Sequence, residues 1–146
     1  MSDLHVDSVG RYEHKLFRLI QQIEPDIILD TGDLTDLYEP QKRKRELNKL
    51  ARLFQQLTPQ YGIYSVLGNH DWPLQDTTRF EERSRVKILR DEEGLITGNA
   101  GQFRLLGLSF RKSWHGDKAL IEQWRNTVRK EEFTIVLGHA PEYILD

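Results

Sequence analysis

The chain has 146 residues, with 21 basic and 23 acidic side chains and a net charge of −2. This length suits one domain with a substantial core, and the near-neutral charge gives no sign of a partner held by bulk electrostatics, such as nucleic acid. Cysteine is absent, which excludes disulfides, thiolate metal sites and cysteine nucleophiles. No apolar stretch reaches the length of a membrane span. We expect a soluble, cytoplasmic chain, with an anchor in a segment upstream of Met1 left open.

Helical and extended segments alternate along most of the chain. Apolar periodicity and turn signals predict, in order, an extended segment at residues 3–5, a helix at 11–24, a strand at 26–29, a helix at 41–57, a strand at 63–67, a short helix at 78–85, a strand at 86–89, an antiparallel hairpin within 95–108, a helix at 117–129 and a strand at 133–137. Such alternation is typical of an α/β layered fold, and we expect a single domain over residues 1–146.

The first two predicted helices each carry an apolar stripe. Asp7 or Ser8 is placed to cap the first helix. The inward face of the first helix is predicted to comprise Tyr12, Leu16, Leu19, Ile20 and Ile23, and that of the second Leu47, Leu50, Ala51, Phe54 and Leu57. A basic run at residues 42–45 begins the second helix, and we interpret it as a solvated face because no aromatic residue interleaves with it.

The chain is organised around residues 27–36, in which an apolar strand ends in Thr31-Gly32-Asp33. The glycine permits a sharp turn and leaves Asp33 at the strand tip, where ligands collect in open α/β sheets. Three further clusters lie at or beside predicted strand ends: Asp3-Leu4-His5, Gly68-Asn69-His70-Asp71 and Gly138-His139. Turn or capping chemistry explains each cluster alone, but their shared position favours one site.

Carboxylate, imidazole and amide oxygen atoms without thiolates form a ligand set that suits Mn²⁺, Fe or Zn²⁺. Asp33 is central and has two oxygens, so it is suited to bridge two ions. Such a pair activates a bridging water as hydroxide for in-line attack on a phosphate. A neighbouring histidine that is not a ligand can protonate the leaving alkoxide. The residues therefore predict a dimetal phosphoesterase site.

The same clusters resemble, in the same order, the signature motifs of the calcineurin-like metallophosphoesterase family. Asp3-Leu4-His5 matches the D-x-H motif, residues 32–36 match GDxxD, residues 68–71 match GNHD, and Gly138-His139 matches a later histidine motif. The resemblance covers essentially the whole chain, and GDxxD followed by GNHD is highly specific. It implies a four-layer αββα sandwich with two divalent metal ions (Mn, Fe or Zn) at the strand ends.

The resemblance also implies a role for each matched side chain. It assigns Asp3 and His5 to one ion, Asp33 to both, and Asn69 and His139 to the other. His70 is implied to be catalytic without being a ligand, either by contacting the phosphate or by protonating the leaving group. Asp71 is implied to orient His70. The implied reaction is hydrolysis of a phosphomonoester or phosphodiester.

The chain departs from the family pattern at both ends. The family's final GHxH motif is not matched, because Pro141 stands where a second histidine would follow Gly138-His139-Ala140. The strand expected before Asp3 is almost wholly absent. We therefore expect an incomplete fold, truncated at both ends, that lacks one ligand per ion and has little activity as a 146-residue chain.

Two other functions stay open at this point. One is an inactive relative that keeps the fold as a binding module, which the intact Asp33, Asn69 and His70 disfavour. The other is a nuclease of the same family, which the near-neutral charge disfavours. The expected partner is a phosphate-ester substrate, and the sequence specifies no oligomeric state. Weaker candidates for substrate contacts are Trp72, Arg111, Lys112 and His115.

Overall fold

The computed structural model of the chain describes residues 1–71, 78–98, 101–110, 115–129 and 131–140, and for residues 115–117 the backbone alone. Its helices are α1 (Arg11–Ile23), α2 (Pro40–Gln55), α3 (Thr78–Ser84) and α4 (His115–Thr127). Its strands are β1 (Ile28–Asp30), β2 (Ile63–Ser65), β3 (Val86–Ile88), β4 (Glu92–Gly98), β5 (Gly101–Leu108) and β6 (Phe133–Gly138). These elements agree with the predicted helices and strands to within a few residues.

Within these ranges, no helix combines the length and the apolar character needed to cross a membrane. Some residues singled out by the sequence lie outside the described residues. They are Trp72, Arg111, Lys112, Pro141 and the side chain of His115.

The described strands form two three-stranded sheets. In the first sheet β1, β2 and β3 are parallel, with Ile28 opposite Ile63 and Ile63 opposite Val86. In the second sheet β4 pairs with β5 antiparallel, and β5 pairs with β6 parallel, with Phe103 opposite Phe133. Because β1 and β2 are parallel neighbours, the loops that follow them emerge at the same edge of the first sheet.

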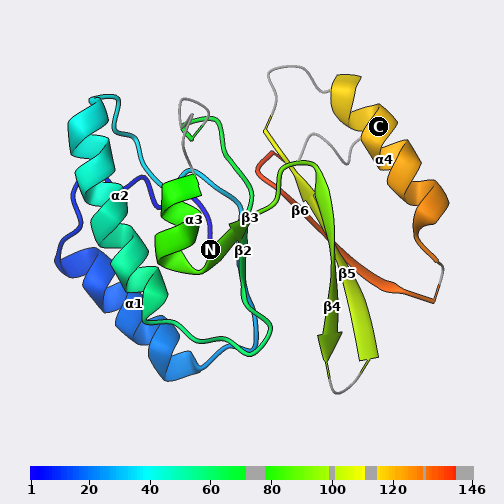
Figure 1. Cartoon of the computed structure of the whole chain (residues 1–146), viewed down its shortest axis with the longest axis horizontal. Helices are drawn as coiled ribbons and strands as arrows, with labels where there is room; N and C mark the ends of the chain where they lie inside the picture. The colour runs from blue at the N-terminus through cyan, green and yellow to red at the C-terminus, as the bar shows by residue number, and fades with distance from the viewer. Residues whose placement is uncertain (72–77, 99–100, 111–114, 130, 141–146) are drawn as a thin grey trace.

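The helices and strands form four layers (Figure 1), and three apolar clusters among the described residues hold these layers together. The helices α1, α2 and α3 cover one face of the first sheet through a cluster that includes Phe54. The two sheets pack on each other through a second cluster, which includes Val66 and Leu105. The helix α4 covers the second sheet through Leu108 and Trp124. This order of helix, sheet, sheet and helix confirms the expected αββα sandwich.

α1 begins differently from the prediction. Its N-cap is Gly10, and the Glu13 carboxylate accepts a hydrogen bond from the Gly10 N–H at 2.7 Å. Neither Asp7 nor Ser8, the expected caps, stands at the N-cap position. The helix starts with a capping-box arrangement, in which a glutamate in the first turn reaches back to the N-cap backbone.

The buried face of α1 is only partly the predicted one. Phe17 is buried and packs edge-on against Phe54 of α2, with 4.8 Å between the ring centroids. Three residues predicted to face inward are instead exposed: Tyr12, Leu19 and Ile23. The prediction was wrong for these residues because the buried stripe of a helix is set by the neighbour against which it packs, here α2 and the first sheet.

Glu46 joins the segment after His5 to α2. Its side chain is buried, and its carboxylate accepts a hydrogen bond from the Val9 N–H at 2.9 Å. Arg45 Nε and Lys49 Nζ each lie 3.0 Å from Glu46 Oε1. Burial raises the pKa of Glu46, but the Val9 N–H and the two cations outweigh this effect and lower the pKa to about 2.

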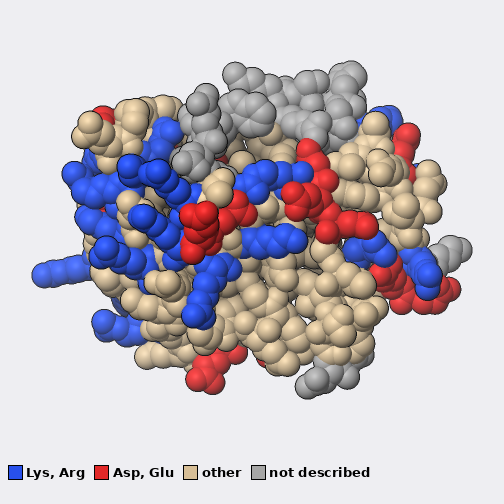
Figure 2. Space-filling view, in the orientation of Figure 1, with Lys and Arg blue, Asp and Glu red and all other residues tan. Residues whose placement is uncertain are grey.

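The basic residues of α2 have partners within the chain as well as contact with solvent. Figure 2 shows Lys and Arg side chains gathered over the helical layer. Lys44 is exposed, whereas Arg43 Nε donates a hydrogen bond to the Leu37 carbonyl. The run at residues 42–45 therefore both faces solvent and fixes the turn that precedes α2.

Asp30, the last residue of β1, is fully buried. Its Oδ2 accepts a hydrogen bond from Ser65 Oγ at 2.7 Å, and among the described residues its Oδ1 has no hydrogen-bond partner. Burial raises the pKa of Asp30 to about 7, although the Ser65 hydroxyl and the amino terminus lower it. The folded chain therefore keeps a proton on this carboxyl group at pH values at which the unfolded chain has lost it.

We predict that Asp30→Asn raises the free energy of unfolding at about pH 8 by about 1–3 kcal/mol. The folded pKa of about 7 lies above the unfolded value near 3.9, so the wild type loses stability as the pH rises from about 4 to about 7. The neutral amide does not titrate. Urea unfolding across this range measures the difference, with the exposed Asp7→Asn as the control. Parallel pH profiles for the wild type and Asp30→Asn would contradict the prediction.

Candidate metal centre

The loops that follow β1 and β2 touch at two glycines. Gly32 has a φ of +97°, and a Cβ atom there would lie 2.4 Å from the Gly68 backbone nitrogen. A Cβ atom at Gly68 would lie 2.1 Å from Asp33 Oδ1 and 2.7 Å from the Asp33 backbone nitrogen. Glycine at both positions therefore lets the two loops approach closely enough to bring Asp33 against residues 69–71.

Asp71 holds these two loops together. Its buried carboxylate accepts hydrogen bonds from the backbone N–H groups of Asp33 at 2.6 Å, Leu34 at 3.0 Å and Gly68 at 3.1 Å. Burial raises the pKa of Asp71, and the three donors oppose that effect. We expected Asp71 to orient His70, but its oxygens accept hydrogen bonds from backbone N–H groups instead. A different carboxylate lies against the His70 ring.

Asp3 and His5 reach the centre from the N-terminal segment. The Asp3 N–H donates to the Gly32 carbonyl at 3.0 Å, and the His5 N–H donates to the Asp33 carbonyl at 2.9 Å. Their φ angles are +52° and +43°, in the left-handed region, and Asp33 has a φ of +58°. The expectation of an extended segment is wrong here. Backbone hydrogen bonds to residues 32 and 33, rather than strand alternation, direct both side chains to one place.

Ser2 and Thr31 support Asp3 from the outer side of the centre. Ser2 Oγ donates a hydrogen bond to Asp3 Oδ2, and Thr31 Oγ1 donates to Ser2 Oγ at 2.6 Å. The bond from Ser2 lowers the pKa of Asp3, while burial opposes this effect. The carboxylate is thereby kept in the charged form that a cation requires.

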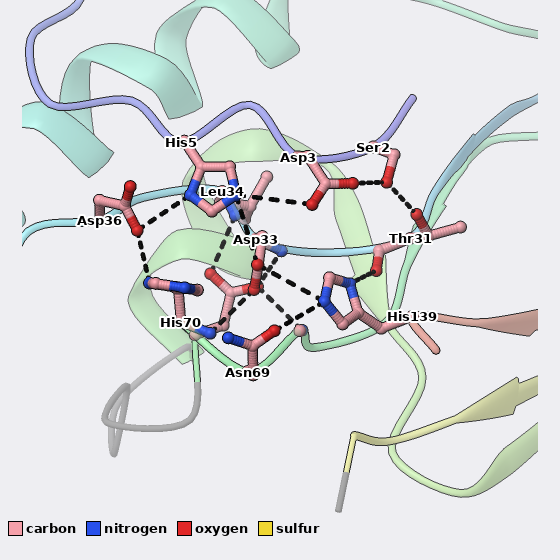
Figure 3. Close-up of polar contacts among 12 residues, drawn as sticks. Ser2, Asp3, His5, Thr31, Asp33, Leu34, Asp36, Asn69, His70 and His139 are labelled. Atoms are coloured by element: carbon pink, nitrogen blue, oxygen red, sulfur yellow. Dashed lines mark hydrogen bonds and ion pairs between the residues drawn. The ribbon is translucent and has the colours of Figure 1, made fainter. Parts of the chain in front are cut away.

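Two histidines face Asp33 with the same ring nitrogen (Figure 3). His5 Nε2 and His139 Nε2 each lie 3.5 Å from Asp33 Oδ2. On the other side of the rings, His5 Nδ1 lies 2.9 Å from Asp36 Oδ1, and His139 Nδ1 lies 2.8 Å from the Thr31 carbonyl oxygen. Both acceptors favour a proton on Nδ1, which leaves the Nε2 lone pair of each ring directed at Asp33.

This donor set fits divalent cations. His139 Nε2 also lies 2.9 Å from Asn69 Oδ1, and Asp3 Oδ1 lies 3.5 Å from His5 Nε2. With both rings protonated at Nδ1, ring lone pairs face carboxylate and amide oxygens with no hydrogen between them, an arrangement that a cation stabilises. Ligand bonds of about 2.0–2.2 Å place neighbouring ligand atoms about 3–3.5 Å apart, which is close to these separations.

The ligand atoms of the described residues fall into two groups that share Asp33. One group is His5, Asp33 and His70, and the other is Asp3, Asp33 and His139, with the atoms of each group within 4.8 Å of one another. The resemblance paired Asp3 with His5, and Asp3 Oδ1 lies 3.5 Å from His5 Nε2, while the grouping also brings Asp3 together with His139. It also places His70 close enough to act as a ligand. The shared position of Asp33 is the one expected of a bridging carboxylate.

Asp36 contacts two histidine rings at once. His70 Nδ1 lies 2.5 Å from Asp36 Oδ1, the same oxygen that faces His5 Nδ1. The Asp36 carboxylate beside Nδ1 raises the pKa of His5, against the effect of burial. The backbone N–H of His70 donates to Asp33 Oδ1 at 2.8 Å, which fixes the residue against the centre.

The structure brings together all the residues predicted for the centre. They are Asp3, His5, Asp33, Asn69, His70 and His139. The sequence analysis did not identify Asp36 as a partner of the histidines. Its position as the last residue of the GDxxD motif could have indicated this role. It also missed Tyr38, whose hydroxyl lies 3.4 Å from His70 Nδ1 and for which no motif exists.

A layered α/β fold with a carboxylate and histidine centre at its strand ends is typical of metal-dependent hydrolases. Residues 1–145 match the family model of the calcineurin-like phosphoesterases, and the chain belongs to this family. Its members typically bind divalent metals and hydrolyse phosphoesters, which agrees with the ligand set described above.

Curated relatives carry the same family name. The uncharacterized metallophosphoesterase YkoQ of Bacillus subtilis is 32% identical over 162 aligned positions, covering 100% of this chain and 53% of that protein. A protein of Danio rerio named transmembrane protein with metallophosphoesterase domain is 31% identical, covering 97% of this chain and 34% of that protein. An uncharacterized metallophosphoesterase of Aquifex aeolicus is 30% identical, covering 62% of this chain and 34% of that protein. The chain thus spans about half of the first protein and about a third of the other two.

Among solved structures, a protein of unknown function from Aquifex aeolicus superposes on this chain with a TM-score of 0.49 at 14% sequence identity. The superposition covers 94% of this chain and 87% of that chain.

We predict that Asp33→Asn weakens Mn²⁺ binding more than any other single change of a ligand, by about 100-fold or more. The reason is that Asp33 belongs to both groups of ligand atoms. Calorimetric titration compares it with His5→Ala and Asn69→Ala, for which we expect about tenfold losses, and with the exposed Asp7→Asn as the control. Equal losses in the three ligand variants would remove the bridging assignment.

We predict that Asp71→Ala lowers the free energy of unfolding by about 3–5 kcal/mol, because three buried N–H groups lose their acceptor. Asp71→Asn retains one acceptor oxygen and should lose less. Urea unfolding without added metal measures both variants, with Asp7→Ala as the matched control at an exposed position. A loss below about 1 kcal/mol for Asp71→Ala would show that the loops do not depend on these bonds.

Proposed function

We propose that this centre hydrolyses phosphomonoesters or phosphodiesters with two divalent cations, with Mn²⁺ the cation to test first because the ligands are oxygen and imidazole nitrogen atoms. The observation that carries the proposal is the position of Asp33 Oδ2, 3.5 Å from the Nε2 atoms of both His5 and His139. One carboxylate oxygen between two imidazole lone pairs supports a pair of ions rather than a single one. Cations held there supply Lewis-acid activation of water and of the phosphoryl oxygens.

His70 is the residue suited to protonate the leaving group. Asp36 lies 2.5 Å from Nδ1 and favours a proton on that nitrogen. When the ring is protonated on both nitrogens, Nε2 is the one that can give its proton to the leaving oxygen as the P–O bond breaks, and the ring keeps the proton on Nδ1. Asp36 touches no reacting atom in this scheme and acts as a positioning residue for both His70 and His5.

The expected activity is metal-dependent release of nitrophenol from bis-nitrophenyl phosphate or nitrophenyl phosphate. The assay uses the full gene product that contains this chain, with and without Mn²⁺, and Asp33→Asn as the variant that lacks the shared ligand. Stimulation by Mn²⁺ that disappears in Asp33→Asn supports the proposal. An inactive binding module, the main alternative, would bind metal and give no turnover with either ester.

We predict that His70→Ala lowers kcat for an ester with a poor leaving group by about 10²–10⁴-fold while the metal content stays near normal. The loss should shrink for a nitrophenyl ester, because its leaving group needs little protonation. Steady-state kinetics with both kinds of ester, together with metal analysis of the purified variant, test this. His70→Ala that purifies without metal would show that His70 is a ligand, as its place beside His5 and Asp33 also permits.

A further inference from the structure

The positive charge of the chain is concentrated on two helices. α1 and α2 together carry nine basic side chains and two acidic ones, Glu13 and Glu46, and both glutamates are buried. These helices therefore have a net charge of +7 in a chain whose total is −2, which leaves −9 on the remainder. By comparison, α4 carries two basic and two acidic side chains. Basic side chains predominate over the helical layer in Figure 2, so the near-neutral total conceals a strongly positive surface.

The basic residues of α1 form one row. Arg11, Lys15 and Arg18 are separated by four and three positions, so they lie on the same side of the helix, and all three are exposed. On α2, Lys44 and Arg52 are exposed as well. Among the described residues, no carboxylate forms an ion pair with any of these five side chains. Their charges are therefore available to an anionic partner.

An exposed apolar row borders the basic row of α1. Tyr12, Leu19 and Ile23 are 70%, 51% and 64% exposed, and their spacing of seven and four positions places them on one side of the helix. Phe17 and Gln21 contact the α2 segment from the opposite side, because each stands two positions from Leu19. The apolar row therefore faces away from α2 and lies outside the core.

The two rows together have the pattern of a helix that lies in the surface of a membrane. Lys15 stands three positions after Tyr12 and four before Leu19, so a cation lies directly beside the apolar row. In such helices the apolar side chains enter the boundary between head groups and acyl chains, and lysine and arginine stay beside anionic head groups. Tyrosine is enriched in the same interfacial layer.

Other partners match this surface less well. A nucleic acid would contact the cations through its phosphates but would leave the apolar row exposed to water. A second copy of the chain, paired through the same face, would bring two positive surfaces together. An anionic lipid surface is the partner that uses both rows at once.

We propose that α1, together with the basic face of α2, docks this chain on an anionic lipid bilayer. The apolar row of α1 enters the head-group boundary, and the cations of both helices contact the lipid phosphates. This inference does not rest on the proposed function, because none of the residues in the two rows belongs to the metal centre.

The test measures binding of the full gene product to vesicles by flotation. One set contains phosphatidylcholine alone, and the other includes about a third phosphatidylglycerol. EDTA is present throughout, so that no cation at the centre can hold a lipid phosphate. We expect preferential binding to the anionic vesicles that weakens as the salt concentration rises.

Two double variants separate the contributions. Lys15→Glu with Arg18→Glu should lower the affinity for anionic vesicles about 30-fold, because each basic residue near the surface contributes about fivefold. Leu19→Gln with Ile23→Gln keeps the charge and should lower the affinity about tenfold. The matched control, Lys118→Glu with Arg125→Glu, makes the same change of charge at exposed positions of α4 and should have little effect. Urea unfolding verifies that each variant is folded.

Three results would overturn the proposal: equal binding of the wild type to both kinds of vesicle, an equal loss in the control pair, or an unchanged affinity in the glutamine pair. Tighter binding to a DNA duplex than to anionic vesicles would assign the surface to nucleic acid, and a dimer that dissociates in the glutamine pair would assign it to a second copy. Hydrolysis of a soluble ester without vesicle binding would remove this inference alone. Vesicle binding that depends on α1, without hydrolysis of any ester, would remove only the proposed function.

Discussion

The carboxylate of Asp71 accepts hydrogen bonds from the backbone of both loops that build the centre, and the position of Asp33 depends on it. The loops after β1 and β2 approach until Gly32 touches the Gly68 backbone, and Asp71 satisfies three N–H groups at that contact. Asp33 is held there in a left-handed conformation, with its carboxylate turned toward the histidines. A buried acceptor for three donors stabilises a strained turn that two loops could not maintain separately.

The histidine rings are oriented by acceptor oxygens in the loop after β1. These oxygens lie against the Nδ1 atoms of the rings. Asp36 faces the Nδ1 atoms of both His5 and His70, so one carboxylate lies against a candidate ligand ring and against the proposed acid. The Thr31 carbonyl does the same for His139, which comes from 108 residues further along the chain. Because the β1 loop provides both Asp33 and these acceptors, ligand orientation and the position of the shared carboxylate are coupled.

The second sheet contributes one residue, His139, to the centre. β6 pairs in parallel with β5, and the sheet packs against the first through Val66, Leu105 and Leu137. This packing sets His139, just after the end of β6, beside Asn69 at 2.9 Å. The helical layer contributes a different residue. The buried turn that leads into α2 places Tyr38 at the edge of the centre. The two sheets and the turn before α2 thus contribute separate portions of the site.

By itself, the sequence determined the order of helices and strands, the types of ligand and the family. These features depend on local periodicity and on motifs a few residues long, such as Gly32–Asp33 and Asn69–His70. The tertiary structure decided which side of α1 is buried, that Asp71 binds backbone rather than His70, and that Asp36 pairs with the rings. Those outcomes depend on contacts between segments far apart in the chain, such as Phe17 with Phe54 and Asp71 with Leu34. Local patterns assign a polar residue to a strand end, but which partner satisfies it is settled only when the loops pack.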